Sequence, residues 1–132
     1  MERAVLIMGP PGSGKSTQAE MVSREYDLVH LNAGDFLKDL IDKGKLIDTN
    51  YVAGQLVDSR IVLDVVKEEV KRIKVNGGNG IVFSGSPRTV LEAYGDEERQ
   101  GLIDFLKELY PDNVYFFRLV IPYDMGEKRN LG

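Results

Sequence analysis

The stretch AVLIMGPPGSGKSTQAE, residues 4–20, decides the fold. It begins inside a short continuous apolar run, RAVLIM at residues 3–8, which predicts a strand buried on both faces. It ends in STQAE, which continues as helix-forming sequence to about residue 27. Between the two lies GPPGSGKS, which fits the pattern G-x-x-x-x-G-K-[ST]. A strand, this loop and a helix in that order predict a phosphate-binding loop that holds a nucleotide.

The residues of the loop match the chemistry of phosphate binding. Gly12 and Gly14 let backbone N–H groups converge on phosphate oxygens, because no Cβ stands in the way. The start of the following helix adds unsatisfied donors and the positive end of a dipole. We expect Lys15 to reach the β- and γ-phosphates and the Ser16 hydroxyl to ligate Mg²⁺.

Strand and helix patterns alternate along the rest of the chain. Further strands are predicted at 28–32, 81–84 and 113–121, and helices from residue 34, over 58–74 and around 102–109. This alternation predicts parallel βαβ units. We therefore expect a three-layer α/β fold with a parallel sheet and helices on both faces, formed by a single P-loop core domain over residues 1–132.

Three finer expectations concern side chains outside the loop. Tyr115, Phe116 and Phe117 alternate within a predicted strand and are expected to be core and sheet-face residues. The run DEER, residues 96–99, is expected to be a solvated helix face. His30 is the only histidine and has no evident partner for metal binding or catalysis, so a structural role is expected.

Composition excludes several classes of protein. The 132 residues carry 17 basic and 21 acidic side chains, a net charge of -4, which disfavours a nucleic-acid partner. Cysteine is absent, which excludes disulfides and thiolate zinc sites. No apolar run approaches the roughly 18 residues of a membrane helix, and the N-terminus lacks a secretory signal. We expect a cytoplasmic monomer whose partners are small molecules, with no nucleic acid and no membrane.

Four motifs in order narrow the class of P-loop protein. They are GPPGSGKSTQ (9–18), AGDFLK (33–38), GQLV (54–57), and GSPRT with EA shortly after it (85–93). The N-K-x-D and D-x-x-G motifs that a GTPase needs are absent, and IVLD (61–64) falls within a helical pattern, so Asp64 is expected on a helix surface. By these motifs the chain resembles the adenylate kinases of the nucleoside monophosphate kinase family.

The resemblance implies two nucleotide sites. Donor ATP, with Mg²⁺, would sit on Gly12, Ser13, Gly14, Lys15, Ser16 and Thr17, with Arg129 near its adenine. The acceptor, with AMP as the first candidate, would be held through a small helical insertion at about residues 32–62 and the segment after the third strand. Its implied contacts are Ala33, Gly34, Asp35, Lys38, Gln55, Leu56, Val57, Gly85, Arg88 and Glu92. Lys15 and Arg88 are the implied catalytic residues.

Five positions depart from the family pattern. Ala33 replaces a threonine, Lys38 an arginine, Glu92 the glutamine that reads the adenine edge, and Ser84 the aspartate that ends the third strand. Ser16 stands where adenylate kinases commonly have glycine, although the general loop pattern has Ser or Thr. With these changes, a pyrimidine monophosphate or another small molecule remains possible as the acceptor.

The final stretch, YDMGEKRNLG, has the appearance of a crossover helix that stops early. The resemblance implies that in the family a lid domain with further arginines follows this point. We therefore expect this chain to be a fragment or a shortened member of the family. Loss of such arginines lowers phosphoryl-transfer rates on the order of 10³-fold or more, and we expect weak activity. The alternative function is an ATP-binding module with little catalysis. A kinase for a non-nucleotide metabolite is a third possibility, against which GSPR and GQLV argue.

Overall fold

Four parallel strands form the sheet of the computed structural model, which describes residues 2–10, 12–44 and 58–120. The order across the sheet is β2-β3-β1-β4. The strands are β1 (Arg3–Met8), β2 (Val29–Asn32), β3 (Gly80–Ser84) and β4 (Val114–Arg118). In the register, Leu6 of β1 lies between Phe83 of β3 and Phe116 of β4. The predicted parallel α/β fold is confirmed.

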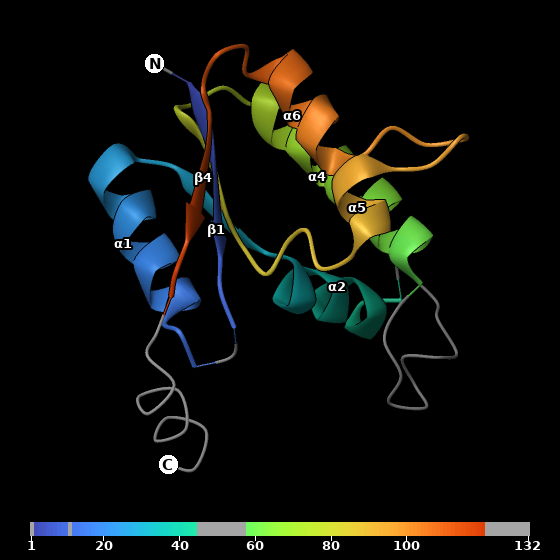
Figure 1. Cartoon of the computed structure of the whole chain (residues 1–132), viewed down its shortest axis with the longest axis horizontal. Coiled ribbons are helices and arrows are strands. Elements are labelled where there is room, and N and C mark those ends of the chain that lie inside the picture. The colour runs from blue at the N-terminus through green and yellow to red at the C-terminus, as the bar shows by residue number, and fades with distance from the viewer. Residues whose placement is uncertain (1, 11, 45–57, 121–132) are drawn as a thin grey trace.

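Helices cover the two faces of this sheet unequally. α1 (Lys15–Tyr26) lies on one face, and α4 (Ser59–Val75), α5 (Val90–Tyr94) and α6 (Leu102–Leu109) lie on the other (Figure 1). α2 (Ala33–Asp42) follows β2 at one end of the sheet (Figure 1). None of the helices in the described ranges is long and apolar enough to cross a membrane.

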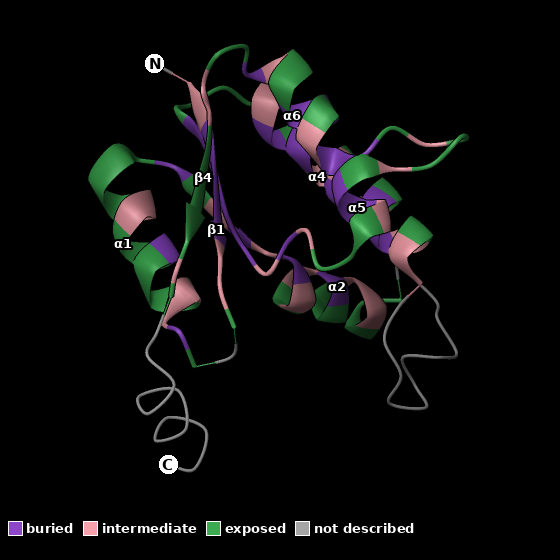
Figure 2. Cartoon of the chain, viewed as in Figure 1, coloured by how far each residue is buried: buried purple, intermediate pink, exposed green. Residues whose placement is uncertain are grey.

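Two apolar clusters separate because neighbouring residues of a strand point to opposite faces. Val5 and Val82 pack with Ala19 of α1. Leu6 and Phe83, both 0% exposed, pack into the larger cluster formed with α4 and α6. Figure 2 shows the buried residues concentrated along the central strands and on the inner sides of α4, α5 and α6. Burial on both faces explains why these strands read as continuous apolar runs.

The aromatic residues of β4 differ from their predicted environment. Tyr115, Phe116 and Phe117 are 37%, 45% and 54% exposed, so the prediction that they are core residues was wrong. β4 lies at the edge of the sheet, next to β1, and the helices cover the central strands instead. The strand is also shorter than predicted, since regular pairing in the described part ends at Arg118.

Residues 96–99 form a turn rather than the predicted helix face. The Asp96 carboxylate accepts hydrogen bonds from the backbone N–H groups of Glu98 at 2.8 Å and Arg99 at 2.9 Å. This local capture of backbone donors competes with helix formation. Asp64 is exposed on α4, as predicted, and forms an ion pair with Arg99 at 3.3 Å.

The carboxyl ends of the parallel strands meet at one edge of the sheet. The loop after β1, the start of α2 after β2 and the segment Gly85–Arg88 after β3 all leave the sheet there. Ligands of open α/β sheets bind at this edge. The fold therefore brings the predicted donor and acceptor segments together.

Candidate phosphoryl-transfer site

The glycine loop after β1 has the backbone that a phosphate cradle needs. Gly12 and Gly14 have φ angles of 80° and 86°, a region that side chains with a Cβ rarely adopt. Gly9 is required for a different reason, because a Cβ there would lie 2.5 Å from Ser13 Oγ. The Ser13 side chain is buried, and its hydroxyl has no hydrogen-bond partner among the described residues. Such a group suits a loop built to receive a polar ligand.

Lys15 is the first residue of α1 and folds back over the loop. Its Nζ donates to the Gly9 carbonyl at 3.1 Å. Within the described ranges no carboxylate forms an ion pair with it. No acid of the described ranges therefore neutralises its positive charge, which can face a phosphate on the loop.

Lys15 and Arg88 line the same cavity, of about 450 Å³. The residues around it are Ile7, Met8, Gly9, Lys15, Gly85, Ser86, Pro87 and Arg88. Two of these are charged and both are cations, so the cavity favours an anion. One cation comes from the predicted donor loop and the other from the predicted acceptor segment.

The guanidinium of Arg88 is held by the loop that carries it. Its Nε donates to the Gly85 carbonyl at 2.9 Å. A Cβ on Gly34 would lie 2.9 Å from Nη2, and a Cβ on Gly85 would lie 3.4 Å from the same atom. Gly34 therefore leaves room for Arg88, whereas Gly85 has a φ angle of 92°, a region that side chains with a Cβ rarely adopt.

The start of α2 forms the neighbouring wall, through a residue that sequence reasoning missed. Asn32 is the N-cap of α2, and its Oδ1 accepts from the Asp35 N–H at 3.2 Å. The same oxygen lies 3.4 Å from the point that a Gly34 Cβ would occupy, beside Arg88. Its position as a polar residue directly before the predicted helix is the signal that could have identified it. Asp35 and Lys38 are exposed on α2, whereas Ala33 is 1% exposed in the core.

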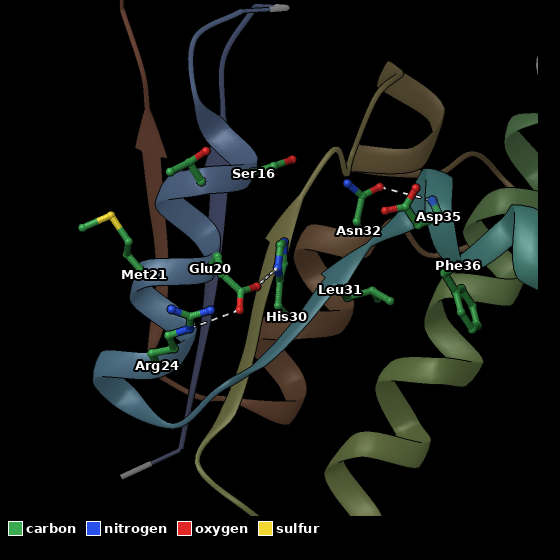
Figure 3. Close-up of a pocket in the computed structure, with 10 residues that line it drawn as sticks. Ser16, Glu20, Met21, Arg24, His30, Leu31, Asn32, Asp35 and Phe36 are labelled. Atoms are coloured by element: carbon green, nitrogen blue, oxygen red, sulfur yellow. Dashed lines mark hydrogen bonds and ion pairs between the residues drawn. The ribbon is translucent and has the colours of Figure 1, made fainter.

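A second cavity of about 820 Å³ opens between α1 and the start of α2. Ser16, Thr17, Asn32 and Asp35 are among its lining residues. Figure 3 shows Ser16 on α1 and Asn32 at the end of β2 lining this cavity from separate elements. Ser16 and Thr17 are exposed, so their hydroxyls are accessible to a ligand on the loop.

Known proteins are similar to this chain over most of its length. A family model described as an AAA domain matches residues 8–128. The adenylate kinase of Leptospira biflexa serovar Patoc is 30% identical over 134 residues, which cover 98% of this chain and 68% of the relative. The chain belongs to the adenylate kinase family. The family resemblance predicted from the four motifs is confirmed.

Other members of the family are longer. The adenylate kinase of Wigglesworthia glossinidia brevipalpis is 34% identical over 119 residues, and that of Baumannia cicadellinicola is 32% identical over 121 residues. The matches cover 89% and 88% of this chain, but 54% and 56% of the relatives. The chain thus spans about half the length of these adenylate kinases.

Ser84 occupies the position at which the family resemblance implies an aspartate, and its hydroxyl is hydrogen-bonded to His30. His30 Nδ1 lies 3.1 Å from the Glu20 carboxylate (Figure 3). Nε2 of the same ring lies 2.7 Å from Ser84 Oγ. Because a carboxylate can only accept, Nδ1 donates to Glu20, which leaves Nε2 for the hydrogen bond with the Ser84 hydroxyl. The hydrogen bond from His30 lowers the pKa of Glu20 below its ordinary value. The predicted structural role of His30 omitted this chain of contacts, which links three elements.

Glu92 stabilises the start of α5. It is 5% exposed, and its Oε2 accepts from the Thr89 hydroxyl at 3.1 Å. The Thr89 hydroxyl accepts in turn from the Glu92 N–H at 3.1 Å, which makes a reciprocal cap. The predicted contact of Glu92 with an acceptor base stays a prediction.

Several predicted site residues lie outside the described residues. These are Gln55, Leu56, Val57 and Arg129. Within the described ranges, no group of three or more His, Cys, Asp or Glu could hold a metal ion. The exposed Ser16 hydroxyl still fits Mg²⁺, because Mg²⁺ bound with a nucleotide takes most of its ligands from phosphates and water.

Proposed function

We propose that this chain transfers the γ-phosphoryl group of Mg·ATP to a nucleoside monophosphate, with AMP as the acceptor. The observation that carries the proposal is the cavity of about 450 Å³ between Lys15 and Arg88. An enzyme that joins two phosphorylated substrates needs positive charge on both sides of the transferred group. Here one cation belongs to the family's donor loop and the other to its acceptor segment.

The proposed roles follow from the elements that hold each residue. ATP lies on Gly12 to Thr17, with Lys15 on its β- and γ-phosphates and Ser16 toward Mg²⁺, which supplies further positive charge to the phosphates. Arg88 holds the acceptor phosphate between Gly34 and Gly85. An oxygen of that phosphate attacks the γ-phosphorus, the bond to the bridging oxygen of ATP breaks, and two ADP molecules result. Positioning and charge contribute most to such a transfer.

The proposal also covers the other acceptor-side residues, the biological role, the location and the oligomeric state. Ala33, Asp35, Lys38 and Glu92 would belong to the acceptor side, as their motif positions imply. A role in nucleotide biosynthesis, a cytoplasmic location and a monomeric state complete it.

A second candidate is a nucleotide-binding module with little catalysis. The observation that favours it is the contact between Ser84 and His30 at 2.7 Å. Ser84 offers a neutral hydroxyl where the family resemblance implies a carboxylate, and that hydroxyl is already hydrogen-bonded to His30. Under this proposal the chain binds ATP without a separate acceptor site.

Calorimetry with two nucleotides tests the proposal. AMP is titrated into the chain after saturation with Mg²⁺ and a non-hydrolysable ATP analogue. We expect one further equivalent of AMP to bind, because the cavity offers a second cation, Arg88, beside Lys15 of the donor loop. Competition between AMP and the analogue for a single site would contradict the kinase proposal and favour the binding module.

A further inference from the structure

Ser86 is a buried polar residue to which the proposed mechanism gives no role. It lies in the segment between β3 and α5 and is 3% exposed. Its hydroxyl has no hydrogen-bond partner in the part of the chain that the structure describes. Ser86 also lines the cavity of about 450 Å³, together with Lys15 and Arg88.

Buried hydroxyls without a partner are rare, because burial removes their hydrogen bonds to water. Among the described residues, the side chains with such an atom are Ser13, Ser86 and Tyr110. Tyr110 belongs to the apolar cluster under α4 and α6. Ser13 lies beside Gly9, which lines the same cavity as Ser86. Two of these three hydroxyls therefore flank the proposed phosphate site.

We propose that the Ser86 hydroxyl donates a hydrogen bond to a phosphate oxygen of the nucleoside monophosphate, beside Arg88. This inference rests on the proposed function. A phosphate oxygen can only accept, and Ser86 Oγ–H is a donor with no other described acceptor. The acceptor phosphate is assigned because Ser86 lies two residues from Arg88, in the segment whose Gly85 carbonyl anchors the guanidinium. Ser86 is thus a binding residue for the acceptor.

Ser86→Ala and Tyr110→Phe make a matched test, since each removes one buried hydroxyl without a described partner. For Ser86→Ala we expect about tenfold weaker AMP binding by calorimetry, with Mg·ATP binding unchanged. We expect its melting temperature to be no lower than that of the wild type, because no intramolecular hydrogen bond is lost. Tyr110→Phe should keep both affinities and should not melt earlier.

The outcomes separate this inference from the function on which it rests. Wild-type affinity for AMP in Ser86→Ala would overturn the role of Ser86 and leave the kinase proposal intact. A lower melting temperature with unchanged AMP affinity would also overturn it, because the hydroxyl would then have a structural partner. Failure of the wild type to bind AMP beside Mg·ATP would overturn the kinase proposal and this inference together.

Discussion

Replacing Lys15 with alanine is expected to weaken Mg·ATP binding at least about a hundredfold, or about 2.7 kcal/mol. The physical reason is the position of its ammonium group at the phosphate loop. Nζ bonds only a backbone carbonyl, that of Gly9 at 3.1 Å, and forms no ion pair in the described ranges. Calorimetric titration of Mg·ATP into the wild type and the variant measures the effect.

Lys107→Ala is the matched control for this loss of charge. Lys107 is exposed on α6, on the face of the sheet opposite α1. The control should bind Mg·ATP as the wild type does. Thermal unfolding of both variants checks that the fold is retained. An affinity of Lys15→Ala within about twofold of the wild type would show that the loop does not use this lysine for phosphate.

Arg88→Ala is expected to weaken AMP binding about a hundredfold and to leave Mg·ATP binding unchanged. Arg88 is one of two cations on the cavity, and its guanidinium is held by Gly85 and packed against Gly34. Charge-assisted hydrogen bonds to phosphate are about twice as strong as neutral ones, so their loss dominates the affinity. Calorimetry with AMP and, separately, with Mg·ATP measures the two affinities.

Arg88→Lys refines this prediction, because lysine keeps the charge but lacks the planar two-pronged donor. We expect its AMP affinity to fall between those of the wild type and Arg88→Ala. Unchanged AMP binding in Arg88→Ala would remove Arg88 from the acceptor site. Equal losses of AMP and Mg·ATP binding would instead indicate that the substitution disturbs the phosphate loop.

The fold was largely predictable because its signals are local. The apolar runs of β1 and β3 and the glycine loop each lie within about ten consecutive residues. Exposure in β4 was not predictable, because Tyr115 and Phe117 read like core residues and only the sheet order places them at an edge. The turn at Asp96 was missed because its carboxylate binds backbone donors that a helix would have used.

In the candidate site too, local motifs were predictable from the sequence, whereas contacts between distant residues were not. Lys15, Gly34 and Arg88 could be singled out from the sequence because each belongs to a motif, and their roles stay predictions. The contact of His30 with Ser84 joins residues 54 positions apart, so no local pattern reveals it. Ser86 could not be singled out either, because a serine in a loop is ordinarily solvated, and only its burial shows an unused donor.

Transfer of a radiolabelled γ-phosphate from Mg·ATP to AMP measures the proposed reaction itself. Wild type, Lys15→Ala and Arg88→Ala are compared, with CMP, UMP and GMP as alternative acceptors. We expect slow formation of labelled ADP that requires AMP, Lys15 and Arg88. Absence of AMP-dependent labelled ADP from the wild type, or equal amounts from Lys15→Ala, would contradict it.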